Sequence, residues 1–323
     1  MKAVRLFGIQ DVRVVEESGP GPEPGRVVLD VSQTALCRTD AKMWAVGQRD
    51  LVLPRILGHE VAVRDPKDGQ KYVVWPGNAC GVCDLCLVGR QNLCRHMKLL
   101  GFHLDGGLAE KISVSPSSLI ALPPGLNSKI ATLAEPLGCG LNALERLSLA
   151  QRETCLIFGG GPVGLLLASA VVRKGGRPCV VEPDPDRLQR GHRFMEALGI
   201  EYKDRVPNRT FDTAINAAPD GNILSEALER LRPAGRFCLF SGLTRGPEFS
   251  PGLINEIHYR ELVLIGAYGC TRDQMAAALE LLSDFSTEME QLIDRWIRLE
   301  QVPEVLADVW DSRVMKCVVQ LEP

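Results

Sequence analysis

Four cysteines stand close together in the segment CGVCDLCLVGRQNLC, at a spacing that suits a metal ion. They follow a C-x2-C-x2-C-x7-C arrangement, and tetrahedral Zn²⁺ takes four thiolates at about 2.3 Å. Two disulfides would need an oxidising compartment, and the polar, glycine-containing spacing argues against four buried free thiols. The spacing therefore predicts a closed, structural zinc site held by Cys80, Cys83, Cys86 and Cys94.

A glycine-rich segment, GGGPVG, follows the β-branched run CLIF and precedes the apolar run LLLASAVV. It matches G-x-G-x-x-G, and in this strand–turn–helix context the pattern predicts a dinucleotide site, with the pyrophosphate at the helix N-terminus. The alternative is a glycine-rich turn that binds nothing. The cofactor residues predicted in the turn are Gly159, Gly161, Pro162, Val163 and Gly164.

Glu182 ends the next predicted strand, CVV, at the offset where a carboxylate accepts hydrogen bonds from the adenosine ribose. A carboxylate there would repel a 2′-phosphate, so we prefer NAD to NADP. Arg187 argues the other way, because a nearby arginine can accommodate that phosphate.

The four-cysteine segment and the glycine-rich segment lie in parts of the chain with different predicted secondary structure. The first half of the chain is strand-like: VRLFGI and VRVVEE predict a hairpin, and RVVLDVSQTAL is another alternating run. From about residue 140, short β-branched runs alternate with helical segments, which predicts βαβ units on a parallel sheet. After Gly269 the helical segment TRDQMAAALELL and the strand MKCVVQL are expected to return to the first domain.

Composition excludes several classes of protein. The chain has 323 residues, and Lys+Arg 37 against Asp+Glu 40 gives a net charge of −3, so nucleic acid and anionic membranes are not expected partners. Its 11 cysteines are odd in number, and MKAVRLFGIQ has no apolar signal region, so we expect reduced thiols and a cytoplasmic protein. The uncharged stretch 155–172 is broken by glycines and a proline, and predicts a strand, a turn and a buried helix.

With these features placed, the chain resembles the zinc-dependent medium-chain dehydrogenases and reductases, in particular the polyol, sorbitol and threonine dehydrogenase branch. The motifs that carry the resemblance are CRTD (37–40), LGHE (57–60), the four cysteines, DGGLAE (105–110), AEPL (134–137), the glycine turn and the run from Glu261 to Gly266. It implies an α/β protein with a GroES-like β-barrel catalytic domain, residues 1–139 and 270–323, and a Rossmann NAD-binding domain with a doubly wound parallel sheet, residues 140–269. It also implies a second zinc, in the cleft between the domains.

The resemblance assigns the catalytic zinc to Cys37 and His59. In the polyol branch the third position belongs to Glu135, and Glu60 approaches the metal directly or through water. One thiolate, one imidazole and one carboxylate neutralise Zn²⁺ and leave a position open for substrate. Cys139, four residues after Glu135 and so on the same face of a helix, competes with it as a softer ligand.

Neighbouring residues take further roles by the same resemblance. Thr39 would take the alcohol proton, Asp40 would hold the imidazole of His59, and Arg38 would contact the cofactor pyrophosphate. Lys42 stands where many relatives carry a histidine that ends a proton relay, so the relay is expected to end at the ribose or at water. His103 is a candidate for the substrate pocket, with a surface-loop histidine as the alternative.

One stretch is shorter than in the family, since only the 15 residues from Val61 to Trp75 separate GHE from PGNACG. A trimmed hairpin of the barrel is therefore expected.

The leading hypothesis is a homodimeric or homotetrameric enzyme that moves hydride between NAD(H) and a secondary alcohol of a polyol, cyclitol or amino-alcohol. The alternatives are an idle zinc- and dinucleotide-binding scaffold or redox sensor, and a zinc-free reductase of the same superfamily, which would lack the CRTD, GHE and four-cysteine motifs.

Overall fold

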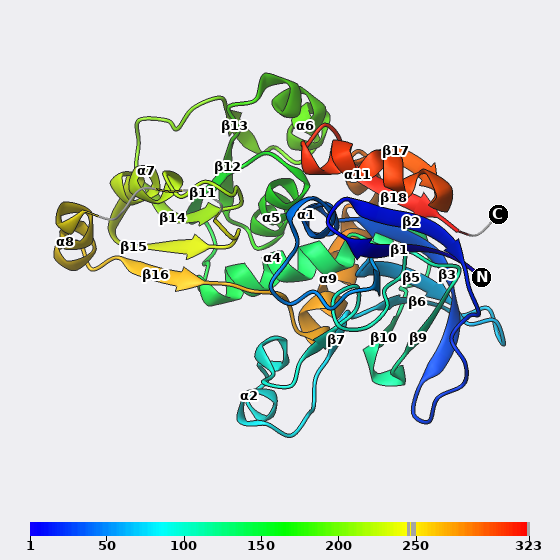
Figure 1. Ribbon diagram of the computed structural model, residues 1–323. Coiled ribbons are helices and arrows are strands. Elements are labelled where there is room, and N and C mark those ends of the chain that lie inside the picture. The colour runs from blue at the N-terminus through cyan, green and yellow to red at the C-terminus, as the bar shows by residue number, and fades with distance from the viewer. Residues whose placement is uncertain (244–245, 247–249, 322–323) are drawn as a thin grey trace. The chain divides into compact units, whose positions relative to one another are not determined.

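Two units make up the chain in the computed structural model (Figure 1), which describes residues 1–243, 246 and 250–321. The first unit is formed by Met1–Gly138 with Cys270–Pro323, and the second by Cys139–Gly269. Each unit has a sheet system and a hydrophobic core of its own.

The first unit is built mainly from antiparallel strands. Its strands are β1 (Lys2–Gly8), β2 (Asp11–Glu16), β3 (Val27–Leu36), β4 (Arg55–Ile56), β5 (Glu60–Arg64), β6 (Lys71–Val74), β7 (Gly77–Asn78), β8 (Lys98–Leu99), β9 (Lys111–Val114), β10 (Leu119–Ala121), β17 (Ile293–Arg298) and β18 (Lys316–Gln320). Its helices are α1 (Arg38–Val46), α2 (Asp84–Leu87), α3 (Ser128–Ala131), α9 (Arg272–Asp284), α10 (Ser286–Glu290) and α11 (Val302–Trp310), with short 3-10 turns η1 (Gln91–Leu93), η2 (Pro116–Ser118) and η3 (Leu299–Gln301). Helix α4 (Ala134–Arg146) runs from the first unit into the second.

The long strand β3 organises this unit, because it pairs with β5, β9 and β18. Its inner face contributes Leu29 and Val31 to a core shared with Val61 and Val63 of β5. The predicted first hairpin is confirmed as β1 and β2, and β18 confirms the predicted final strand. Strand β17 and helix α11, which precede β18, were not predicted from the sequence.

The short segment after Glu60 forms one hairpin. Strands β5 and β6 pair directly, and the turn between them is closed by a hydrogen bond from the Asp65 backbone N–H to the Gln70 carbonyl at 2.9 Å. The Asp65 side chain also accepts a bond from the Lys67 N–H at 2.9 Å. The 15 residues from Val61 to Trp75 are thus used by two strands and a tight turn.

The second unit confirms the predicted alternation of strands and helices. Its elements are β11 (Thr154–Phe158), α5 (Pro162–Arg173), β12 (Arg177–Val181), α6 (Pro185–Ala197), β13 (Glu201–Lys203), β14 (Phe211–Asn216), α7 (Ile223–Arg230), β15 (Leu231–Leu239), α8 (Pro251–Tyr259) and β16 (Val263–Gly266). The strands form a six-stranded parallel sheet in the order β13-β12-β11-β14-β15-β16. This order reverses at β11, which places the turn after β11 at the switch point where doubly wound sheets bind ligands.

The uncharged stretch 155–172 folds as expected into β11, the glycine turn and the buried helix α5. Side chains from Leu165 to Ala168 are fully buried. Within the part of the chain that the structure describes, no helix has the length and apolar character needed to cross a bilayer.

Candidate metal centres and dinucleotide site

The four-cysteine lobe brings its thiols together around short turns. The sulfur atoms of Cys80, Cys83, Cys86 and Cys94 all lie within 4.8 Å of one another, and none of them is in a disulfide. Backbone N–H groups point at them: Cys94 Sγ accepts bonds from the N–H of Cys80 at 3.3 Å and of His96 at 3.4 Å.

Those backbone contacts prepare the lobe for a cation. Hydrogen bonds from the backbone N–H groups of Arg95 and Cys86 lower the pKa of the Cys83 thiol to about 6, whereas burial raises the pKa of Cys86 to about 12. A thiolate and further close thiols form the donor set that tetrahedral Zn²⁺ takes in closed sites. The residues therefore fit a structural zinc.

A second group of donors gathers where two neighbouring strands of the first unit meet. Cys37 follows the end of β3, His59 precedes β5, and Glu60 is the first residue of β5, opposite Ala35 of β3. One ligand atom from each of Cys37, His59 and Glu60 lies within 4.8 Å of the others. A thiol, an imidazole and a carboxylate are the mixed donors of three-ligand zinc sites.

Asp40 connects the two segments that carry Cys37 and His59. It is fully buried in the first turn of α1 and accepts bonds from the backbone N–H of Cys37 at 2.9 Å and of Gly58 at 3.2 Å. Its Oδ1 also lies 3.3 Å from Nδ1 of His59. Burial acts to raise the pKa of Asp40, but the charge of His59 and the two N–H groups hold it below its usual value. Asp40 therefore lies in contact with the imidazole of His59, and its role in orienting that ring stays a prediction.

A pair of glycines fixes the approach to His59. The N–H of Gly106 donates to the carbonyl of Ile56 at 2.8 Å, and that of Gly107 to Gly58 at 2.9 Å. A Cβ on Gly106 would come within 2.2 Å of the Gly58 carbonyl oxygen, so only glycine allows this contact. The preceding Asp105 accepts from the Ile56 N–H.

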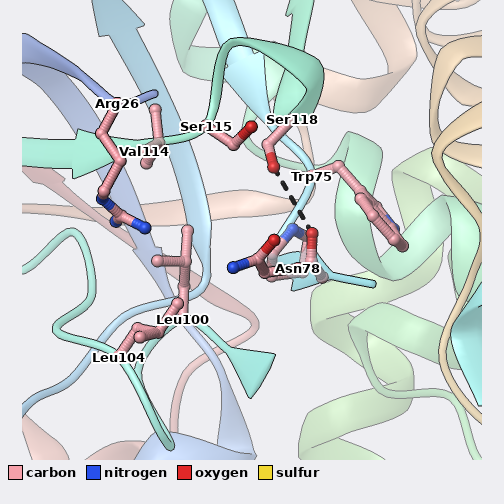
Figure 2. Close-up of a pocket in the computed structure, with 10 residues that line it drawn as sticks. Arg26, Trp75, Asn78, Leu100, Leu104, Val114, Ser115 and Ser118 are labelled. Carbon is pink, nitrogen blue, oxygen red and sulfur yellow. Dashed lines mark hydrogen bonds between the residues drawn. The ribbon is translucent and has the colours of Figure 1, made fainter. Parts of the chain in front are cut away.

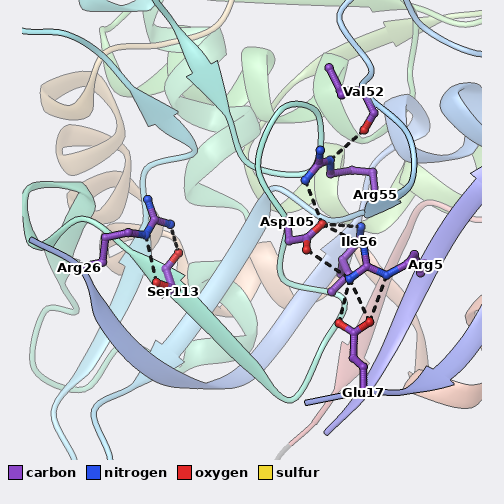
Figure 3. A network of polar contacts seen from close by, with 8 residues as sticks. All are labelled: Arg5, Glu17, Arg26, Val52, Arg55, Ile56, Asp105 and Ser113. Atoms are coloured by element: carbon purple, nitrogen blue, oxygen red, sulfur yellow. Dashed lines mark hydrogen bonds and ion pairs between the residues drawn. The ribbon is translucent and has the colours of Figure 1, made fainter. Parts of the chain in front are cut away.

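Arginines anchor Asp105 in turn (Figure 3). Arg5 lies between the carboxylates of Glu17 and Asp105, at 2.8 and 3.2 Å, and Arg55 bonds Asp105 at 3.0 Å. This network holds the loop of the glycine pair against the strand that leads to His59.

Lys316, the first residue of β18, is a functional candidate that the sequence reasoning missed. Its Nζ donates a hydrogen bond to Glu60 Oε1 at 2.6 Å and also contacts Oε2; Lys316 is 4% exposed and Glu60 0%. Burial acts to lower the pKa of Lys316, but the charges of Glu60 and Cys37 raise it above its ordinary value, so the amine stays protonated. The one sequence signal was a lysine heading the apolar run CVV.

Glu135 does not join the group formed by Cys37, His59 and Glu60. It lies half-buried in the first turn of α4, with its carboxylate within 4.8 Å of the Cys270 sulfur, although its charge still acts on Glu60. Cys139 is one turn further along α4 and belongs to the second unit.

Three predicted residues lie on α1, beside Cys37. Thr39 and Lys42 are half-buried, and Arg38 is exposed, with its guanidinium carbon 4.9 Å from the centre of the Trp310 ring. The contact is a cation–π interaction, and it fixes the arginine on α11.

His103 stabilises the turn in which it lies. Its Nδ1 accepts a bond from the Leu99 N–H at 3.2 Å, and burial lowers its pKa. Its neighbour Phe102 packs on His59, with ring centres 5.6 Å apart. A nearby pocket beside Trp75, Asn78 and Ser118 (Figure 2) has a volume of about 10 Å³, room for about one water and not for a substrate.

The glycine turn of the second unit has the shape of a phosphate cradle. Gly159 has φ +109°, and a Cβ on Gly164 would lie 1.9 Å from the Gly159 carbonyl oxygen, so both positions require glycine. At Gly161, the N-cap of α5, a Cβ would meet nothing within 4 Å. Pro162 and Val163 then form the first turn of α5. This open space at a helix N-terminus fits a dinucleotide pyrophosphate.

Glu182 stands at the end of β12, beside this turn. Its Oε2 accepts bonds from the Gly160 N–H at 2.9 Å and from Arg187 at 3.0 Å, and its Oε1 accepts from the Asp184 N–H at 3.0 Å. A carboxylate has about four acceptor positions, so room for a ribose hydroxyl is left on Oε1. Glu182, whose charge favours NAD, therefore forms an ion pair with Arg187, whose charge would favour NADP.

Comparison with known proteins finds similar proteins along most of the chain. Residues 23–124 match the family model described as the alcohol dehydrogenase GroES-like domain. An uncharacterised zinc-type alcohol dehydrogenase-like protein of Haemophilus influenzae is 28% identical over 96% of this chain and 95% of its own length. The D-altritol 5-dehydrogenase of Agrobacterium fabrum is 29% identical, with 91% of each chain covered.

A solved structure extends the likeness to the whole fold. A zinc-binding dehydrogenase from Sinorhizobium meliloti, crystallised with NADP, superimposes with a TM-score of 0.88 at 25% identity, covering 99% of this chain and 98% of that one. The predicted fold class, a GroES-like domain combined with a parallel-sheet domain, is thereby confirmed. Over nearly its whole length the chain is thus similar to proteins of the medium-chain dehydrogenase/reductase superfamily, and residues 23–124 match the model of its GroES-like domain.

Proposed function

We propose that this protein is a zinc-dependent oxidoreductase that transfers hydride between NAD(H) and a secondary alcohol or ketone of a polyol, cyclitol or amino-alcohol. The observation that carries the proposal is the group of Cys37 with the buried His59 and Glu60, whose ligand atoms lie within 4.8 Å of one another. Relatives of the chain are zinc-type alcohol and polyol dehydrogenases, which supports a hydroxylated substrate.

In this proposal the first unit holds two zinc ions and the second holds the dinucleotide. Cys37 and His59 bind the catalytic ion, with a carboxylate from Glu60 or Glu135 as the third donor. Zinc supplies the Lewis acidity that favours loss of the alcohol proton, and the nicotinamide supplies the hydride acceptor. The four-cysteine lobe binds the structural ion.

The chain's own residues then handle the proton and the orientation of the site. The hydroxyl of Thr39, two residues after Cys37, receives the alcohol proton. Asp40, in contact with Nδ1 of His59, would hold the imidazole in the tautomer that leaves Nε2 available as a zinc donor. Lys42 would not continue the relay as a histidine would, so the proton would pass from Thr39 to water or to the ribose of a bound dinucleotide.

The cofactor is proposed to be NAD, held by Gly159–Gly164 and by Glu182. The S. meliloti structure contains NADP, and Arg187 gives this chain a cation that could meet a 2′-phosphate. The negative charge of Glu182 next to that arginine is the reason for preferring NAD. We also propose that the protein is a homodimer or homotetramer.

The test is Cys37→Ser, measured by metal content, NADH binding and an NAD-reduction screen over polyols, inositols, amino-cyclitols and threonine. The wild type is expected to hold two zinc ions and the variant one, with turnover abolished and NADH binding unchanged. Cys317→Ala is the matched control, because Cys317 is a buried thiol of the same unit outside the two proposed donor sets. One zinc in the wild type and no turnover would instead indicate an idle scaffold.

A further inference from the structure

The imidazole of His59 is in contact with an aromatic ring to which the proposed function gives no role. The ring centres of Phe102 and His59 lie 5.6 Å apart, and the two ring planes are inclined at 59°. Both side chains are buried. A tilted pair at this separation is among the arrangements that aromatic rings favour. The contact therefore acts directly on the orientation of a proposed metal ligand.

The backbone that carries His59 is held by the same turn. Gly101, the residue before Phe102, packs on Gly58, the residue before His59: a Cβ on Gly101 would lie 3.2 Å from the Gly58 nitrogen and from its carbonyl oxygen. Gly101 also has φ +76°, a conformation that favours glycine. The turn thus contacts the His59 segment twice, through the backbone at Gly101 and through the ring of Phe102. With the backbone fixed, the direction of the imidazole depends on its side-chain contacts.

Phe102 is itself held by two backbone hydrogen bonds and by core packing. Its N–H donates to the Leu99 carbonyl at 3.3 Å, and its carbonyl accepts from the Val52 N–H at 3.0 Å. Its ring belongs to a hydrophobic cluster of the first unit that also contains Leu57 and Leu108. Because such interiors are close-packed, a ring fixed in this way restricts the side chain that it touches.

The contact with Asp40 alone leaves the imidazole some freedom. Asp40 Oδ1 lies 3.3 Å from Nδ1 of His59, and a single contact of this length tolerates changes in the side-chain torsion angles. Phe102 packs on the ring, so it limits those changes. The two contacts together set the direction of the second nitrogen, Nε2. Metal affinity depends on this direction, because a ligand already held in its binding orientation loses less conformational freedom when the ion binds.

We propose that Phe102 is a positioning residue of the candidate catalytic metal site: by packing on the imidazole of His59, it holds the ring in the orientation in which Nε2 binds the metal. The proposal rests on the proposed function, since it requires a metal at Cys37 and His59. It assigns part of the preorganisation of this site to an apolar side chain.

The test compares Phe102→Leu, which removes the ring but stays apolar, with Phe102→Tyr, which keeps the ring. Val309→Ala is the matched control, because Val309 is buried in the same core cluster but lies on α11, outside the proposed donor sets. In Phe102→Leu, zinc affinity at this site, measured by chelator competition, should fall roughly 3- to 10-fold. The visible spectrum of Co²⁺ exchanged into the site should also change, because the geometry of the imidazole ligand changes.

The two other variants separate positioning from a general loss of stability, which thermal unfolding measures for all three. Phe102→Tyr and Val309→Ala should keep the wild-type spectrum and an affinity within about twofold of wild type. An unchanged affinity and spectrum in Phe102→Leu, or an equal loss of affinity in Phe102→Tyr or Val309→Ala, would overturn the proposal. Failure of the proposed function looks different, because Cys37→Ser would then bind as much metal as the wild type.

Discussion

The glycine turn allows a sharp prediction, because two of its glycines are required for different reasons. At Gly164 a Cβ would lie 1.9 Å from the Gly159 carbonyl oxygen, a backbone atom of the turn itself. At Gly161 a Cβ would meet nothing within 4 Å, and the backbone there has φ −74°, which alanine adopts freely. Gly161→Ala and Gly164→Ala therefore add the same methyl group to sites with opposite constraints.

The expected stabilities differ accordingly. Gly164→Ala forces backbone to move, at a cost near the upper end of the range of roughly 1–3 kcal/mol for overpacking. For a unit of this size that lowers Tm by roughly 10 °C. In Gly161→Ala, a gain of about 0.4–1 kcal/mol from a stiffer unfolded chain is offset by a weaker N-cap, so Tm should stay within about 2 °C of wild type.

The expected affinities complete the comparison. If the space at Gly161 receives the pyrophosphate, its methyl group costs about 1–3 kcal/mol of binding, or roughly 5- to 150-fold in the Kd for NADH. Calorimetric titration with NADH and thermal unfolding measure both quantities on the same samples. A folded Gly161→Ala variant that binds NADH as tightly as wild type would refute the assignment of this turn to the pyrophosphate.

Three further predictions address the other sites. Cys86→Ser should remove one zinc per chain by metal analysis and make the lobe susceptible to limited proteolysis; unchanged zinc content would count against a metal there. Asp40→Asn leaves one of the N–H groups of Cys37 and Gly58 facing an amide NH2, so we expect a loss of about 1–3 kcal/mol in unfolding free energy and roughly 10- to 100-fold weaker zinc binding. Glu182→Gln should shift the ratio of kcat/KM values toward NADP, and an unchanged ratio would remove its role in cofactor choice.

The second unit could be predicted from the sequence because its signals are local. Strands buried on both faces appear as short β-branched runs, and CLIF, CVV and FDTAIN became β11, β12 and β14. Strand β17 could not be predicted, because its sequence carries no clear local signal. Its sequence IDRWIR mixes charged and apolar residues, and only Ile293 and Ile297 are buried. Its pairing with β18 depends on contacts that no local pattern encodes.

The candidate sites also differ in how much of each could be predicted from the sequence. The cysteine lobe holds its donors within 15 residues, so spacing alone indicates a metal. The group of Cys37 and His59 could be proposed only through a family resemblance, since either residue alone has commoner structural roles. The glycine pair 106–107 is visible in the sequence as part of DGGLAE, yet its purpose, a backbone contact with Gly58, depends on the fold.

Lys316 shows where prediction from the sequence ends. A lysine that heads the apolar run CVV is a charged residue where burial is expected, and a buried lysine requires an anionic partner. The sequence can therefore state that a partner exists, but it offers 40 acidic residues. The choice of Glu60, 256 positions away, follows from the order of β5, β3 and β18 and from the small Ala35 between them. This choice places the ammonium group of Lys316 in contact with Glu60, one of the three side chains whose ligand atoms lie close together at the proposed metal site. A charged residue where the sequence pattern predicts an apolar one is therefore part of the surroundings of that site.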